Sequence, residues 1–256
     1  MPGIAGTPCT TSNQDTCGRL DDDGKMELRV NNRSTTGILS ANSFAAWYRD
    51  DGPYDVEVIP DVLTLTQQGG SSSTTYRFQD NDFFPLDGRG FGSVGSEVPN
   101  CGGGNSSGVE CQENCNGSCA TCNATCRAHN FHFTTELRYF FQYQGGETLT
   151  FTGDDDVWVF VNGRLAVDIG GVHSELSGRV VLGDDGSPTG TDSNCSVHGQ
   201  GTLPPLGNCY DAAEQADNED SRFGLVKGQV YEIVLFHAER HTSESNFALT
   251  MSGFLA

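Results

Sequence analysis

The chain has 256 residues, with 34 Asp and Glu against 14 Lys and Arg and a formal net charge of −20. This acidity argues against nucleic acid, whose phosphates are bound by Lys and Arg, and against anionic membrane surfaces, whereas it suits the binding of cations. Hydrophobic residues make up 36% of the chain, and no stretch approaches the ~20 apolar residues of a membrane span, so we expect a globular domain without membrane insertion.

The first 25 residues are polar and Gly-containing, with Cys9 and Cys17 near their ends. We expect this segment, 1–25, to be a loosely structured lead-in, followed by one domain over 26–256. The start has neither the basic residues nor the apolar run of a secretory signal peptide. A secreted form would therefore have lost its signal beforehand.

From residue 26 onward, short alternating segments rich in β-branched and aromatic residues predict strands separated by Gly-rich turns. We expect helical or turn spacing at 43–48, an ordered loop at 83–92, and strands at 26–30, 56–66, 75–79, 131–144, 147–153, 157–161, 164–169, 178–183, 229–240 and 246–255. No helix of convincing length is predicted. The pattern indicates an all-β fold, an antiparallel β-sandwich.

Ten cysteines and a dense run of them at 99–128 indicate disulfides and an oxidising compartment. Residues 99–128 have no apolar period with which to bury a face, so disulfides would substitute for a core there. Zinc is an alternative for the Cys119, Cys122 and Cys126 spacing, but a second CxxC pair is missing. The cysteines expected in disulfides are Cys9, Cys17, Cys101, Cys111, Cys115, Cys119, Cys122, Cys126, Cys195 and Cys209; Cys195 and Cys209 are expected to pair, and the other connectivity stays open.

Five N-x-S/T sequons agree with a secreted or cell-surface glycoprotein, at Asn32, Asn105, Asn116, Asn123 and Asn194.

The stretch "FTGDDDVWVFVNG" places Asp154, Asp155 and Asp156 where a strand begins. Carboxylates this close repel one another, so solvent, backbone N–H groups or a cation must offset the repulsion. Asn162-Gly163 predicts a two-residue hairpin turn, because a type I′ turn needs positive φ twice. With that turn, Val161 faces Arg164, Val157 faces Asp168 and Asp156 faces Ile169.

This register brings Asp168 to the same end of the hairpin as the three aspartates, with His173 just beyond. Such a cluster of carboxylates suits Ca²⁺, which takes six to eight oxygen ligands. The alternative is ordinary turn chemistry, in which Asp and Gly end a strand and cap the loop. For His173, bracing of the loop is an equally good interpretation as binding a ligand. His237 is expected to be hydrogen-bonded at the edge of the core. Trp158 and Phe160 are expected to be core residues.

Three separated motifs resemble the fibro-slime domain family: "FFPLDGRGFG", "NFHFTTELRYFFQYQGGETLTFTGDDDVWVFVNGRLAVDIGGVHSELSG" and "FHAERHTSESNFALT". That family is a branch of the β-sandwich superfamily of the protective-antigen insert domain and the flocculin lectins. In flocculin-type members, two consecutive aspartates joined by a cis peptide bind one Ca²⁺, which then holds sugar hydroxyls. The resemblance places that pair on Asp154 and Asp155, with Asp156 following.

A second loop of the flocculin-type site supplies an Asn and backbone carbonyls, and it corresponds to "HAERHTSESN", with Asn246 as the side-chain ligand. This loop departs from the flocculin pattern because it carries Glu239, His241 and Glu244. The metal candidates are therefore Asp154, Asp155, Asp156, Asp168 and Asn246, and the ligand-binding candidates are His173, Glu239, His241 and Glu244.

These features predict a secreted or cell-surface adhesion module that binds carbohydrate through Ca²⁺, with glycans or cell-surface and matrix glycoproteins as partners. The alternative is a structural matrix or filament component, in which calcium and disulfides only stabilise the fold and the chain could self-assemble. We expect no enzymatic activity, because adjacent aspartates suit a shared cation better than the separated carboxylates of a glycosidase.

Overall fold

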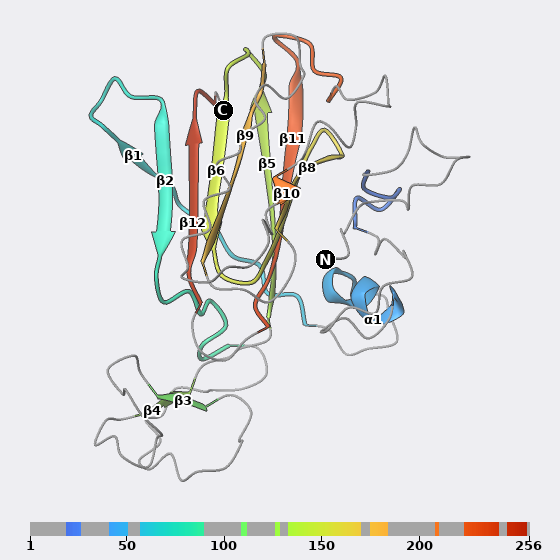
Figure 1. The fold of residues 1–256 in the computed structure, drawn as a ribbon, viewed down its shortest axis with the longest axis vertical. Coiled ribbons are helices and arrows are strands. Elements are labelled where there is room, and N and C mark those ends of the chain that lie inside the picture. The colour runs from blue at the N-terminus through green and yellow to red at the C-terminus, as the bar shows by residue number, and fades with distance from the viewer. Residues whose placement is uncertain are drawn as a thin grey trace.

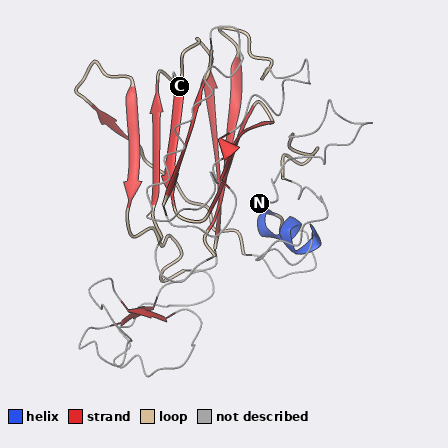
Figure 2. Cartoon of the chain, viewed as in Figure 1, coloured by secondary structure: helices blue, strands red, loops and turns tan. Residues whose placement is uncertain are grey.

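The computed structural model describes residues 19–26, 41–50, 57–89, 109–111, 126–128, 133–169, 175–183, 208–209, 223–240 and 245–254. Strands dominate these residues, as Figure 2 shows. The helices are α1 (Ala41–Ala45) and the 3-10 helix η2 (Ala46–Tyr48). Within the described ranges, neither has the length and hydropathy that crossing a bilayer requires.

Two antiparallel five-stranded sheets face each other (Figure 1). The first has the order β1 (Thr66–Gln68), β2 (Thr75–Asp80), β12 (Phe247–Ser252), β6 (Thr148–Gly153) and β9 (Leu176–Val181). The second has the order β10 (Asn208–Cys209), β8 (Arg164–Ile169), β7 (Asp156–Val161), β11 (Val230–Ala238) and β5 (Thr134–Gln142). The predicted all-β sandwich is confirmed.

Strand β7 is buried on both faces and divides the core into two clusters. Its residues Val157, Val159 and Val161 point between the sheets, where they join a large aliphatic and aromatic cluster. Trp158 and Phe160 point to the opposite face and join a second cluster. The alternation follows from the two-residue period of a strand, and it confirms the prediction that Trp158 and Phe160 are core residues.

The second cluster lies between the second sheet and the N-terminal segment, because Met26, Phe44 and Tyr48 pack there. Figure 1 accordingly shows α1 beside this sheet. Residue 19 forms an isolated bridge with Arg164, and the Leu20 N–H donates to the Gly163 carbonyl at 2.9 Å. The end of the expected lead-in therefore covers one face of the sandwich. The boundary at residue 25 stays a prediction.

Most predicted strands are confirmed, but the one at 56–66 is wrong over 57–65. Only its last residue enters a strand, β1, and no described strand pairs with the rest. Its apolar side chains do not form a sheet face, since Val58 is 67% and Val62 84% exposed, and Pro60 has no N–H for a ladder. The strand predicted at 26–30 lies outside the described residues apart from Met26, which is buried and has no strand assignment.

The predicted hairpin is present, whereas its register is wrong beyond Phe160. Asn162 and Gly163 form the turn with φ of 50° and 72°, and Val161 pairs with Arg164 as expected. A bulge then intervenes: Phe160 pairs with Leu165 but Val159 pairs with Val167, so Ala166 is extra. Val157 consequently pairs with Ile169 in place of Asp168, since one inserted residue shifts all later pairs.

Within the expected Cys-rich insertion, β3 (Val109–Cys111) and β4 (Cys126–Ala128) form a two-stranded antiparallel sheet in which Cys111 is opposite Cys126. Figure 1 places this sheet beyond the end of the sandwich at which β2 ends. The predicted disulfides, including Cys195 with Cys209, involve side chains outside the described part of the structure.

Candidate cation and ligand site

The three consecutive aspartates lie at one end of the sandwich, where four strands begin or end. Asp154 and Asp155 connect β6 to β7, and Asp156 is the first residue of β7. The start of β12 and the end of β11 adjoin them, because Phe247 pairs with Gly153 and Ala238 pairs with Asp156. All three aspartates are buried, with exposed fractions of 4%, 1% and 1%. Solvent therefore does little to offset their mutual repulsion.

Asp154 is joined to the start of β12 at two points. Its N–H donates to the Asn246 carbonyl at 3.3 Å, and the Asn246 side-chain amide donates to its Oδ2. The Asp154–Asp155 peptide is trans, unlike the cis bond that the resemblance implied, since the described residues contain no cis peptide. Asp155 has a φ of 56°, the left-handed region that Asp tolerates better than most residues. The turn thus directs the two neighbouring carboxylates toward different segments.

Asp155 and Asp156 are held by Arg240, the residue that follows Glu239 after β11. The Arg240 backbone N–H donates to Asp155 Oδ2 at 2.7 Å. Its guanidinium donates to both oxygens of Asp156, with Nη2 3.0 Å from Oδ1. The same guanidinium lies 5.5 Å from the centre of the Trp47 ring, a cation–π contact. Asp156 therefore forms an ion pair on the side of the sheet covered by the N-terminal segment.

Two further buried polar residues come from β11 and its end: His237, 0% exposed, and Glu239, 1% exposed. The His237 ring lies among Phe83, Phe133 and Phe247, with centroid separations of 6.0, 5.9 and 5.4 Å. The Glu239 N–H donates to the Phe133 carbonyl at 2.9 Å. This aromatic lining lowers the local dielectric, which strengthens every electrostatic interaction of the adjacent carboxylates.

Gly153 permits the close approach of β12 to this turn, because a Cβ there would lie 2.8 Å from the Asn246 carbonyl oxygen and 2.6 Å from Phe151 Cζ. We expect Gly153→Ala to lower the free energy of unfolding by about 1–3 kcal/mol through overpacking. Denaturant unfolding followed by tryptophan fluorescence measures it. Gly153 lacks the positive φ of glycines such as Gly146, at φ 87°, so a loss at Gly153 reports crowding and not backbone strain. A Gly153→Ala protein as stable as the wild type would contradict the crowding argument.

Burial raises the pKa of Tyr48 well above its usual value, and the negative charges of Asp156 and Glu136 raise it further. The neutral phenol is held in the folded state, where it donates to the His237 carbonyl at 2.8 Å. In the unfolded state Tyr48 ionises near pH 10. Its contribution to stability is therefore complete below pH 10 and declines above it, by up to about 1.4 kcal/mol per pH unit.

Tyr48→Phe should flatten this alkaline decline while costing about 1 kcal/mol at pH 7 for the lost hydrogen bond. The free energy of unfolding is measured between pH 8 and 11 in both proteins. Tyr76→Phe, at a position 39% exposed, is the control and should keep the wild-type slope. A Tyr48→Phe protein with the unchanged slope would contradict the prediction.

Of the predicted set, the structure joins Asp154 to Asn246, holds Asp155 on the N–H of Arg240, the residue after Glu239, and pairs Asp156 with the Arg240 guanidinium. Asp168 is described by its backbone alone, which pairs with Trp158 and Asn208. His173, His241 and Glu244 lie outside the described residues. Arg240 and Trp47 were missed from the sequence, because nothing in the "AER" or "AAWY" stretches marks two positions so far apart as neighbours.

Among the described residues, no group of three His, Cys, Asp or Glu side chains is arranged to hold a metal ion. A site made of two aspartates, one asparagine amide and backbone carbonyls does not need a third side chain of those types. Asp154, Asp155 and Asn246 supply that donor chemistry: rotating the Asn246 amide by half a turn would present its oxygen where its nitrogen now meets Asp154.

Comparisons with known proteins identify relatives. The chain is 33% identical over 210 residues to Protein psiD of Dictyostelium discoideum, which covers 81% of this chain and 28% of that protein. It is 29% identical over 174 residues to Protein psiP, covering 68% and 17%, and 27% identical over 233 residues to Protein psiR, covering 91% and 18%, both from the same organism. The chain thus spans less than a third of the length of these relatives.

No solved structure matches the chain. The PA14 domain model matches residues 109–254, more than half of the sequence and all strands from β3 to β12. The chain therefore belongs to the PA14 domain family.

Proposed function

We propose that this PA14 domain is an extracellular adhesion module that binds carbohydrate through a Ca²⁺ ion held by Asp154, Asp155 and Asn246. PA14 domains are commonly carbohydrate-binding or adhesion modules, which supports the general class. Within that family we assign the chain to the fibro-slime branch, on the three motifs that run in the same order along it. Its partners would be glycans or glycoproteins at the cell surface or in the matrix.

The observation that carries the proposal is the burial of four acidic side chains at one end of the sandwich, Asp154, Asp155, Asp156 and Glu239. Burying a carboxylate is costly unless a positive charge or several donors compensate it. Arg240 neutralises Asp156. A divalent cation beside Asp154 and Asp155 would stabilise the remaining charge, and oxygen donors of this kind suit Ca²⁺.

When bound, Ca²⁺ would coordinate vicinal sugar hydroxyls and so provide the point of sugar recognition. The residues of this chain would fix its position. Asp154 is tied to β12 by two contacts with Asn246, and Asp155 is tied to the end of β11 by the Arg240 N–H. Both anchors adjoin strand ends of the sandwich, because Asn246 directly precedes β12 and Arg240 is the second residue after β11. The ends of these strands therefore hold the two carboxylates in place. We propose binding without catalysis, since the buried aspartates are engaged in positioning.

Calcium binding is tested by isothermal titration of the chelator-treated chain with CaCl₂. We expect Asp154→Asn to lower the calcium affinity at least about tenfold, since it removes one ligand charge. Asp22→Asn is the matched control and should bind calcium normally, because Asp22 is exposed and lies two residues from Leu20, which bonds to Gly163 at the opposite end of β7. Circular dichroism of both variants separates loss of the site from loss of the fold.

A glycan array with and without chelator tests carbohydrate binding. Glycan binding that disappears with chelator and in Asp154→Asn would support the proposal. Calcium binding without any glycan binding would favour the structural alternative, a matrix component stabilised by its cation, and self-assembly measured by sedimentation velocity would then be expected. Glycan binding that survives chelation would overturn the cation-mediated mechanism.

A further inference from the structure

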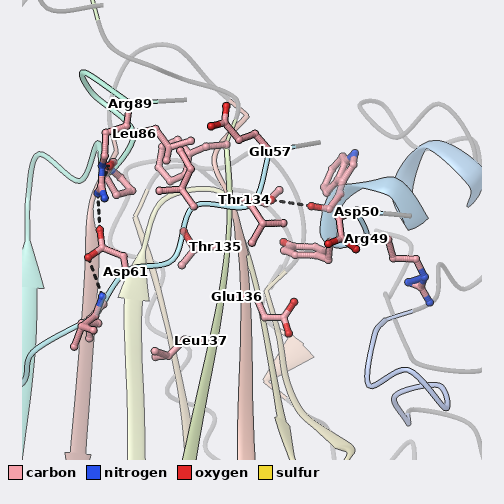
Figure 3. Close-up of a pocket in the computed structure, with 18 of the residues that line it drawn as sticks. Arg49, Asp50, Glu57, Asp61, Leu86, Arg89, Thr134, Thr135, Glu136 and Leu137 are labelled. Atoms are coloured by element: carbon pink, nitrogen blue, oxygen red, sulfur yellow. Dashed lines mark hydrogen bonds and ion pairs between the residues drawn. The ribbon is translucent and has the colours of Figure 1, made fainter. Parts of the chain in front are cut away.

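A groove of about 700 Å³ opens on the side of the sandwich, beside the site already described (Figure 3). Much of its lining comes from three segments far apart in the sequence: residues 57–63, the loop 85–89, and residues 133–137 at and just before the beginning of β5. The end of η2 closes it through Trp47 to Asp50. Its size falls within the range of ligand pockets in proteins.

One long side of this groove is a strand edge that lacks a ladder partner among the described residues. Among the described strands, β5 is the last of its sheet and pairs with β11 alone. Alternate residues of such an edge direct their N–H and C=O groups away from the neighbouring strand, here toward the groove. Opposite, residues 57–65 belong to no strand, and the Val62 N–H donates to Asp61 Oδ1 at 2.8 Å.

The floor of the groove is apolar and its rim is acidic. Phe83 and Phe133 are buried beneath it, at 7% and 4% exposure. The lysine and arginines of the lining are engaged in ion pairs: Lys25 with Glu136, Arg49 with Asp21, and Arg89 with Asp61. Glu57 and Asp50 form no ion pair with another described residue, and Figure 3 shows them on the upper and right-hand parts of the rim. The groove therefore carries surplus negative charge.

We propose that this groove binds an extended basic peptide segment of a partner protein, which adds as a strand beside β5. Backbone pairing to β5 would supply affinity, and the two-residue period of a strand would place alternate apolar side chains on the aromatic floor and alternate Lys or Arg side chains at the acidic rim. The net charge of −20 would favour the approach of a basic partner. The groove does not include Asp154, Asp155 or Asn246, so this proposal is independent of the calcium site.

The test is fluorescence anisotropy of the full chain with a labelled peptide of alternating lysine and valine. One control peptide alternates glutamate and valine, which reverses the charge. The other is the lysine–valine peptide with N-methylated backbone amides, which keeps the charge and removes the donors needed for strand pairing. We expect saturable binding of the first peptide alone, weakening as salt is raised because exposed charges are screened.

On the protein side, Glu57→Gln and Asp50→Asn should each weaken binding by about two- to fivefold, the range for an exposed ion pair. Glu175→Gln, away from the groove, should leave the affinity unchanged. Equal binding of the lysine–valine and N-methylated peptides would overturn strand addition. An equal loss of peptide affinity in Glu175→Gln would show non-specific charge attraction. Binding of a glucosamine oligomer, a basic carbohydrate, with none of the peptides bound, would overturn the choice of a peptide as partner.

Discussion

Replacing Arg240 by Met should lower the free energy of unfolding by about 3–5 kcal/mol, because it leaves the Asp156 carboxylate buried without its guanidinium partner. The Asp156 side chain is 1% and the Arg240 side chain 14% exposed, so water cannot replace the lost donors. Met keeps an apolar stem of similar length, so the change removes the charge, its hydrogen bonds and the cation–π contact with Trp47. Guanidinium unfolding at pH 7 measures the loss.

The double variant Asp156→Asn with Arg240→Met is the matched control. It removes both charges, so it should be more stable than Arg240→Met alone, since the buried unpaired carboxylate is gone. Calcium titration of the same proteins separates two roles. The Arg240 backbone N–H to Asp155 survives the side-chain change, and calcium affinity should therefore fall less than in Asp154→Asn. A double variant no more stable than Arg240→Met would contradict the charge-burial explanation.

The sequence predicted the hairpin of β7 and β8 because its turn has a local code: Asn162-Gly163 supplies two positive φ values. It did not predict the bulge at Ala166, which has no local signature in "GRLAVDI". That single residue changes which positions face Asp156 and Asp168. Local turn chemistry is readable from a few residues, whereas register over a longer hairpin depends on packing against both neighbouring layers.

The incorrect strand prediction at 56–66 shows that local sequence does not determine which segments pair. The segment has strong β-propensity, but propensity describes a residue that fits a paired, half-buried surface, and no described strand lies beside 57–65. At the candidate site, the three adjacent aspartates predicted that their carboxylates would lie together. It could not predict that strand alternation and Arg240 would direct Asp156 to the opposite face from Val157, since Arg240 is 84 residues away in the chain.

Trp158→Ala should lower the free energy of unfolding by about 3–5 kcal/mol, the range for removing a large buried aromatic side chain. Trp158 is 0% exposed and meets Phe44 edge-to-face at a centroid separation of 5.9 Å. It therefore joins the second sheet to the N-terminal layer, and its loss leaves a cavity at that junction. We expect limited proteolysis to cut within residues 1–48 faster in Trp158→Ala than in the wild type, because the segment loses the contact of Phe44 with the sheet.

The control for this change is Phe140→Ala in β5, whose side chain is 61% exposed and lies outside both core clusters. Its effect on stability should stay within about 0.5 kcal/mol, as for most surface positions. If Trp158→Ala unfolded at the same denaturant concentration as Phe140→Ala, the N-terminal layer would not be part of the cooperative unit. If it lost stability without faster proteolysis, the cavity would act within the sheet alone, and the layer would be held by its other contacts, such as the hydrogen bond from Tyr48 to the His237 carbonyl.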